Sequence, residues 1–171
     1  DMIQKEAGVS KATVYNRYPN KEALFFAVIE NCCQITVSEL QSIQVSSDGI
    51  EKTLAQIGCT YLRIILSPNS IALFRTVSAE AVRFPHMGKA FYDAGPKNIC
   101  DIVSKHLSNA SERGDINFQS IGIEQAAILF LSMLRAEGQL EGLMFPDSMP
   151  SEIQIQSWAN IAVSTFIKAY G

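Results

Sequence analysis

Residues 10–21, near the start of the sequence, carry the side chains best suited to binding a nucleic acid. Asparagine and arginine can make bidentate hydrogen bonds to base edges, whereas lysine, threonine and tyrosine suit phosphate oxygens. Lys21 also follows Asn20, an expected helix cap, so its ammonium group would lie beside the free amides of a helix start, where a phosphate can bind. The candidate DNA-binding residues are Ser10, Lys11, Thr13, Tyr15, Asn16, Arg17 and Lys21.

The charge distribution favours a nucleic-acid partner for this segment alone. The 171 residues include 14 Lys and Arg against 17 Asp and Glu, a formal net charge of −3, which argues against a general polyanion binder. Residues 8–21, however, hold three basic side chains and no acidic one, while residues 31–171 carry the net charge of −3. A basic edge on an acidic body suits a specific DNA binder that does not attach to polyanions everywhere.

The local sequence predicts a helical frame for these side chains. Residues 2–7 are expected to form a short helix that ends at Gly8, because glycine suits the left-handed position after a helix end. Ser10 should cap a second helix over 11–18, which Pro19 ends. Two short helices joined by such a turn form a helix-turn-helix, whose second helix enters the major groove. From spacing alone, an αα-hairpin that merely exposes polar residues remains an alternative.

The rest of the chain shows helical periodicity almost throughout. Apolar residues recur three and four positions apart, whereas the sustained period-two alternation typical of strands does not occur in the sequence. Gly95-Pro96 should kink or divide one of the helices. The predicted fold class is all-α, with further helices over 21–43, 49–67, 71–83, 86–113, 121–145 and 151–170.

The segment 6–30, EAGVSKATVYNRYPNKEALFFAVIE, resembles the DNA-binding signature of the TetR family of transcriptional repressors. That signature reads approximately A-G-V-S-K-G-T-[LV]-Y-x-x-F-x-[SN]-K-E-x-L and matches residues 7–24. Ala12 replaces the usual glycine and Tyr18 the usual phenylalanine. Both changes are mild, since alanine favours a helix and tyrosine keeps the aromatic ring. The resemblance implies a dimeric, all-helical repressor with a three-helix head and a larger helical body.

By that comparison the first helix of the head lies before Asp1. Residues 1–45 are then expected to form a helix-turn-helix head, a truncated homeodomain-like three-helix bundle, with its connecting helix. Residues 46–171 are expected to form a helical-bundle domain for effector binding and dimerisation. The segment 74–96, FRTVSAEAVRFPHMGKAFYDAGP, more loosely resembles the C-terminal domain of AefR-like members of the family.

The body carries aromatic side chains on helices that are expected to face one another. Ligand pockets are largely apolar with a few placed polar groups, and the resemblance implies a small, mostly apolar effector. The candidate ligand-binding residues are Tyr61, Phe74, Phe91, Tyr92, Phe130 and Trp158. Plain core packing is the alternative for each of them. Four charged residues on apolar helices could orient a ligand or pair with neighbours: Arg75, Glu80, Arg135 and Glu137.

Broad apolar faces on the last two helices predict a homodimer. Two such helices from each subunit would form an isologous four-helix bundle around a two-fold axis. The two heads would then read half-sites about one helical turn apart, or a multiple of it, in a palindromic double-stranded DNA operator. Faces that cover only the chain's own core are the alternative. The residues concerned are Ala126, Leu129, Phe130, Met133, Leu134, Trp158, Ile161, Ala162, Thr165 and Phe166.

Other classes of protein are disfavoured. No nucleophile elbow, metal-spaced ligand cluster or Gly-rich phosphate loop occurs, so no catalytic residue, metal site or cofactor is predicted. Apolar runs stay well below the ~20 residues of a membrane span. The cysteines form no C-x-x-C pair and are expected to be reduced, partly buried thiols in a cytoplasmic protein, with redox sensing as the alternative. They are Cys32, Cys33, Cys59 and Cys100.

The sequence therefore predicts a ligand-responsive, DNA-binding transcriptional regulator. The predicted mechanism is that of a repressor which a small, mostly apolar effector releases from a palindromic operator. An activator of the same fold, or a regulator without ligand control, is the alternative, and an enzyme is not expected.

Overall fold

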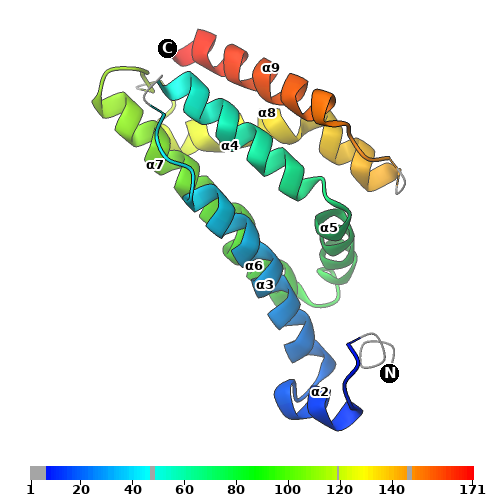
Figure 1. The fold of residues 1–171 in the computed structure, drawn as a ribbon. Helices are drawn as coiled ribbons and strands as arrows, with labels where there is room; N and C mark the ends of the chain where they lie inside the picture. Colours follow the sequence, from blue (N-terminus) through cyan, green and yellow to red (C-terminus); the bar gives the residue numbers. More distant parts are fainter. Residues whose placement is uncertain (1–6, 47–48, 119, 146–147) are drawn as a thin grey trace.

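A computed structural model describes residues 7–46, 49–118, 120–145 and 148–171. Within these ranges every regular element is a helix, which confirms the predicted all-α class (Figure 1). The short helix expected over 2–7 lies outside the described residues. The elements are α2 (Lys11–Arg17), α3 (Lys21–Gln41), α4 (Ile50–Ile65), α5 (Pro68–Glu80), α6 (Pro85–Tyr92), the π-helical turn η1 (Asp93–Lys97), α7 (Asn98–Glu112), α8 (Ile123–Met144) and α9 (Glu152–Tyr170).

α2 and α3 each begin after a residue whose side chain caps the helix N-terminus. The Ser10 hydroxyl accepts a hydrogen bond from the Thr13 amide at 3.1 Å, and the Asn20 side chain accepts one from the Ala23 amide at 2.7 Å. Gly8 has a φ of 65°, the left-handed conformation expected of it. These caps satisfy amides that have no partner inside the helix.

Two proline-containing segments differ from the expected boundaries. α5 begins at Pro68 rather than at residue 71, because Ser67 caps the helix and proline suits the first helical position. At Gly95-Pro96 the chain does not break but passes through η1 into α7. A π-helical turn is wider than an α-helical one, so it can accommodate a proline ring that would clash in a regular helix.

α8 bends at Ala136, whose φ of 1° and ψ of −108° interrupt the helix. Two residues later Gly138 lies against Trp158 of α9. A Cβ atom at Gly138 would lie 2.7 Å from Cζ3 of that indole, closer than side-chain atoms can approach. The contact between these two helices therefore depends on the absence of a side chain at this position.

We expect Gly138→Ala to lower the free energy of unfolding by about 1–3 kcal/mol through overpacking, although alanine is the better helix former by about 1 kcal/mol. In a Trp158→Leu background the same substitution should become neutral or stabilising, because the ring is gone. Urea unfolding of the four proteins in this cycle measures the coupling. Equal costs in both backgrounds would contradict the packing explanation.

The main core lies between α4, α7, α8 and α9, and the C-terminal part of α3 joins it through Val37 and Leu40. Its centre is aromatic: the rings of Phe130 and Phe166 have centroids 5.2 Å apart and both side chains are fully buried. A second, smaller cluster between α3 and α5 consists of Ile29, Cys33, Leu73 and Val77. Thus α3 joins the main core only through its C-terminal part, and its middle packs in the smaller cluster.

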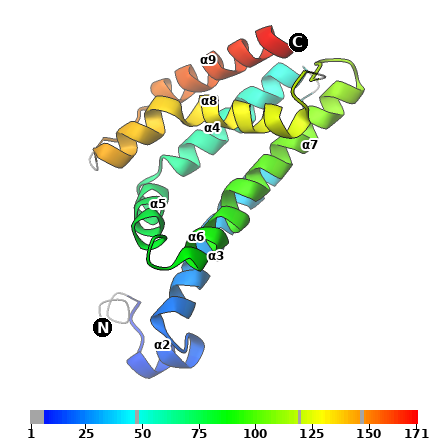
Figure 2. The same ribbon diagram turned by 180° about the vertical axis from the view of Figure 1, so that it is seen from behind.

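α3 connects the two ends of the molecule. In Figure 1 it runs from α2 at one end of the structure, alongside α6 and α7, into the body, and the view from behind in Figure 2 shows the same arrangement. By length and composition alone, with a mean hydropathy of 1.3, α3 could cross a membrane. Core helices of globular proteins meet the same criterion, and the apolar side of α3 faces its helical neighbours.

Candidate DNA-binding face and ligand cavity

The candidate DNA-binding residues lie on the surface of α2 and at the first turn of α3. All seven are exposed, including Tyr15 with 54% of its surface accessible. The hydroxyl oxygens of Ser10 and Thr13 lie 2.8 Å apart, so both also serve the N-terminal cap of α2. The arrangement leaves the polar face of α2 open to a partner.

The first turn of α3 is joined to α6 by a contact that the sequence did not indicate. The His86 ring contacts the Glu22 carboxylate and lies 5.6 Å from the Phe26 ring, centroid to centroid. Phe84 packs edge-on against the same histidine at 6.1 Å. Since 64 positions separate His86 from Glu22, no local pattern could have revealed the pair. It links the first turn of α3, which carries the candidate residue Lys21, to α6.

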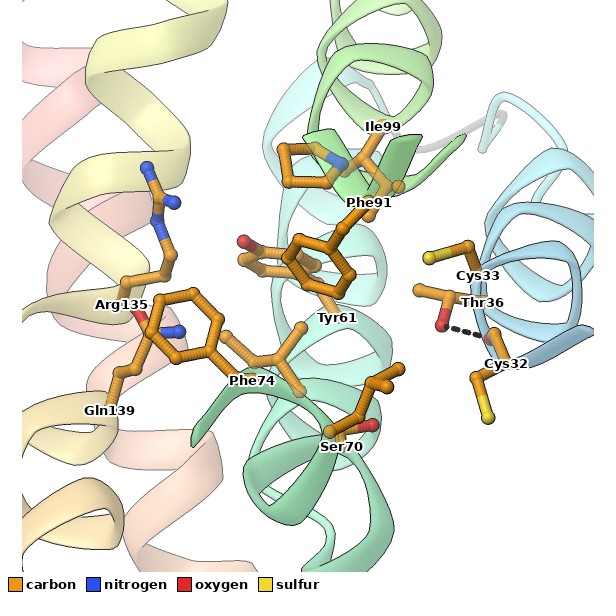
Figure 3. A pocket seen from close by; sticks show the side chains of 14 residues that line it. Cys32, Cys33, Thr36, Tyr61, Ser70, Phe74, Phe91, Ile99, Arg135 and Gln139 are labelled. Atoms are coloured by element: carbon orange, nitrogen blue, oxygen red, sulfur yellow. Dashed lines mark hydrogen bonds between the residues drawn. The ribbon is translucent and has the colours of Figure 1, made fainter. Parts of the chain in front are cut away.

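A cavity of about 70 Å³ lies in the body (Figure 3). Two of its aromatic walls, Phe74 and Phe91, meet edge to face with ring centroids 6.0 Å apart. Its polar side chains include those of Arg135, Gln139, Tyr61, Ser70 and Thr36. The complete lining is Cys32, Cys33, Thr36, Tyr61, Ile65, Ser70, Leu73, Phe74, Phe91, Gly95, Pro96, Ile99, Arg135 and Gln139.

Three of the six aromatic candidates meet in this cavity: Tyr61, Phe74 and Phe91. The others do not line it. Tyr92 is 59% exposed, Phe130 is fully buried in the main core, and Trp158 packs against Gly138. Helical periodicity identifies the apolar face of a helix but not which neighbour that face meets, so spacing could not separate the two groups.

The four charged candidates also separate. Arg135 lines the cavity, whereas Arg75 donates hydrogen bonds to the carbonyl oxygens of Gly142 and Leu143 at 2.8 and 2.7 Å. Those carbonyls belong to the last turn of α8 and lack partners within the helix, so Arg75 acts as a cap from another helix. Glu80 and Glu137 do not line the cavity.

The sequence reasoning missed the contribution of α3 and η1 to the cavity. Cys32, Cys33 and Thr36 form one wall, and Gly95 lies directly against it: a Cβ atom there would lie 3.0 Å from Cys33 Sγ. The Gly-Pro pair within an amphipathic helix was the available signal, because close backbone approach is a common reason for a helical glycine.

Burial controls the protonation of the groups around the cavity. It raises the pKa of the Cys33 thiol to about 11, with a further increase from Cys32, so the thiol is a weak nucleophile at neutral pH. Burial also raises the pKa of Tyr61 to about 12, against the lowering effect of nearby Arg135. The Tyr61 phenol is therefore a neutral hydrogen-bond donor. All four cysteines are free thiols.

The predicted dimer residues divide between core and surface. Five of them lie inside the chain's own core: Ala126, Phe130, Leu134, Ala162 and Phe166. Leu129 is 40% exposed and Ile161 61% exposed. α8 and α9 also expose further large apolar side chains, namely Ile128, Leu140, Met144 and Ile153. The two adjacent helices thus present an apolar outer surface as well as a core-facing one.

Within the described ranges no group of three or more His, Cys, Asp or Glu side chains could hold a metal ion.

Comparison with known proteins agrees with the helical arrangement. Residues 1–28 match the family model for bacterial regulatory proteins of the tetR family, and residues 52–171 match that of the AefR-like transcriptional repressor C-terminal domain. No curated protein sequence matches the chain.

Solved structures show the same relationship. A protein from Mesorhizobium loti assigned to the TetR family of transcriptional regulators superimposes with a TM-score of 0.88 at 23% identity, covering 99% of this chain and 84% of that one. The flavonoid-responsive regulator FrrA is 30% identical, with a TM-score of 0.78 over 98% of this chain and 84% of its own. A TetR-family regulator from Pseudomonas syringae pv. tomato gives 0.73 at 20% identity, over 99% and 84%. The chain therefore belongs to the TetR family of DNA-binding transcriptional regulators, with a C-terminal domain of the AefR-like type.

Proposed function

We propose that this regulator is a repressor that leaves its operator when a small, mostly apolar effector enters the cavity. The observation that carries the proposal is the continuity of α3. The helix α3 follows α2 directly and carries the candidate residue Lys21 at its N-terminus. Further along, the same helix lines the cavity with Cys32, Cys33 and Thr36. A displacement of this wall is therefore transmitted to the head without an intervening joint.

The size of the cavity supports coupling between ligand and helix. Pockets for drug-sized ligands measure roughly 300–1,000 Å³, so a cavity of about 70 Å³ must widen to take one. Tyr61 and Ile99 belong to the main core, whereas Cys33 belongs to the small cluster of four buried residues. Since Cys33 packs in the smaller cluster, we propose that the cavity widens at the α3 wall.

The contact between η1 and α3 gives the widening a direction. Because Gly95 lies against Cys33 without a side chain between them, a ligand that pushes η1 outward also pushes on α3. An effector that prefers the widened cavity shifts the population toward another position of the head. DNA and effector then oppose each other thermodynamically, each weakening the binding of the other.

The assembly we propose is a homodimer with two heads on a palindromic operator. The exposed apolar surface of α8 and α9 supports it, and its burial between two copies would form an isologous four-helix bundle. The proposed division of labour places residues 1–45 in the head and 46–171 in the effector-binding and dimerisation domain. The relative described as flavonoid-responsive supports an aromatic effector. Such a regulator acts in the cytoplasm, where its operator lies.

On DNA, Thr13, Asn16 and Arg17 are proposed to read bases, and Tyr15 and Lys21 to bind phosphates. We expect Arg17→Ala in the full-length protein to cost about 1–3 kcal/mol and to relax sequence preference, because a bidentate base contact is lost. Lys21→Ala should weaken binding to all DNA sequences alike. It should also reduce the slope of log K against log salt concentration by about 1, as expected for the loss of one phosphate contact. Gel-shift titration against the DNA upstream of its own gene, over a series of salt concentrations, measures both effects.

The matched control is Lys105→Ala, which removes an exposed lysine from α7 in the body and should leave binding unchanged. If the full-length protein showed no salt-dependent binding to its own upstream region, the proposed function would be wrong.

A further inference from the structure

Arg135 is the one arginine that lines the cavity. It is only partly exposed, and its side chain extends from α8 together with Gln139, four residues later. In Figure 3 the phenol oxygen of Tyr61 lies on the same side of the cavity, whereas Cys32, Cys33 and Thr36 lie opposite. One side of the cavity therefore brings together a cation, an amide and a neutral phenol, whereas the Thr36 hydroxyl on the other side already donates to the Cys32 carbonyl oxygen.

The guanidinium of Arg135 is poorly satisfied by the chain itself. Within the described residues it makes one hydrogen bond, a long one of 3.5 Å to the Ser132 hydroxyl, and no ion pair. A guanidinium has five N–H donors, and a partly buried charge without a hydrogen-bonded partner costs free energy.

Three other arginines of the body have hydrogen-bonded partners. Arg63 pairs with Glu152, and Arg113 pairs with Asp115 at 2.9 Å. Arg75 donates to main-chain carbonyl oxygens at the end of α8. Arg135 thus differs from them because it lines a cavity and most of its donors have no partner among the described residues.

Building on the proposed function, we propose that the effector is an aromatic carboxylic acid whose carboxylate binds Arg135 and whose ring lies against Phe74 and Phe91. A carboxylate matches the two parallel donors of a guanidinium in a bidentate pair. The edge-to-face arrangement of Phe74 and Phe91 offers ring faces and edges that favour an aromatic partner. The Tyr61 phenol and the Gln139 amide can donate to the remaining carboxylate lone pairs.

The charge of the cavity selects this acid over other groups. Among the described residues its lining holds a single cation and no carboxylate, which suits a monoanion better than a dianionic phosphate ester. A simple phenol, with a pKa near that of tyrosine at about 10, is neutral at pH 7 and would leave the guanidinium unpaired.

The test uses matched acids and esters as probes. Isothermal titration calorimetry compares 4-hydroxycinnamate, 1-naphthoate and indole-3-acetate with their methyl esters, and includes naringenin as a neutral flavonoid. We expect at least one of the acids to bind the full-length protein about tenfold or more tightly than its ester, because a charge-assisted bidentate pair is made. The same acid should release the protein from its operator in a gel shift.

Variants assign the effect to Arg135. Arg135→Gln should remove the preference for acid over ester, while Arg135→Lys should retain part of it, since lysine keeps the charge but not the two-pronged geometry. Arg113→Gln removes an exposed arginine that does not line the cavity, so this control should behave as the wild type. Equal melting temperatures of the variants show that the fold is intact.

The outcomes separate this inference from the proposed function. If naringenin or the esters bind as tightly as the acids, or if Arg135→Gln keeps the preference, the acidic effector is wrong and ligand control stands. If neither acids, esters nor naringenin bind, the acidic effector is wrong as well. Failure of a wider library of apolar compounds to raise the melting temperature would then also overturn ligand control.

Discussion

Replacing Ile161 by arginine should convert the proposed dimer to monomers and abolish tight operator binding, while the protomer stays folded. Ile161 is 61% exposed on the outer side of α9, so the substitution removes little packing within one chain. Between two copies it would place an unpaired charge in an apolar interface, which costs on the order of 3 kcal/mol or more. That corresponds to a loss of more than about a hundredfold in dimer affinity.

Analytical ultracentrifugation over a range of concentrations measures the dimer dissociation constant, and a gel shift measures the loss of DNA binding. The matched control is Val82→Arg, because Val82 is 91% exposed in the turn after α5, away from α8 and α9. The control should remain dimeric. An Ile161→Arg protein with wild-type dimer affinity would show that another surface forms the dimer.

Phe130→Ala should lower the free energy of unfolding by about 3–5 kcal/mol, the usual cost of a large cavity in a core. Phe130 is fully buried, and its ring packs 5.2 Å from that of Phe166, centroid to centroid. Domains are stable by only about 5–15 kcal/mol, so this single change removes a large share of the total. Phe130 does not line the cavity, so we expect the effector affinity of the folded protein to stay unchanged.

Phe91→Ala is the matched comparison, because the same truncation is made in a cavity wall. Phe91 is partly exposed and packs against the small cluster, so we expect a smaller loss of stability and a clear loss of effector affinity. Urea unfolding at a fixed protein concentration gives the stabilities, since dimerisation would otherwise change the apparent value. Equal destabilisation by the two substitutions would contradict the assignment of Phe130 to core and Phe91 to cavity.

The C-terminus of α8 is capped by a side chain from another helix, far away in the sequence. Two carbonyl groups in the last turn of α8 accept hydrogen bonds from Arg75 of α5. One of them belongs to Leu143, which is 68 positions from Arg75 in the sequence. The same charge was an equal candidate for orienting a ligand when only the sequence was considered. Its position relative to α8 decides between the two roles, and that position depends on how α5 packs.

The contact between Glu22 and His86 makes the same point for the head. Glu22 lies in the first turn of α3, and His86 lies in the first turn of α6, so their approach depends on how the two helices lie side by side. The sequence suggested no role for either residue. The contact joins the end of α3 that carries the candidate residue Lys21 to α6, whose Phe91 lines the cavity.

Features that depend only on neighbouring residues were predictable from the sequence. Gly8, Ser10 and Asn20 act within one helical turn of their own positions, so the turn and both caps could be read from residue types, and the signature over 7–24 identified the family. The packing of the helices was needed to show which aromatic residues line the cavity, that Arg135 lines it and that α3 forms a wall. Those facts depend on which helix faces meet, and helical periodicity specifies an apolar face without specifying its neighbour.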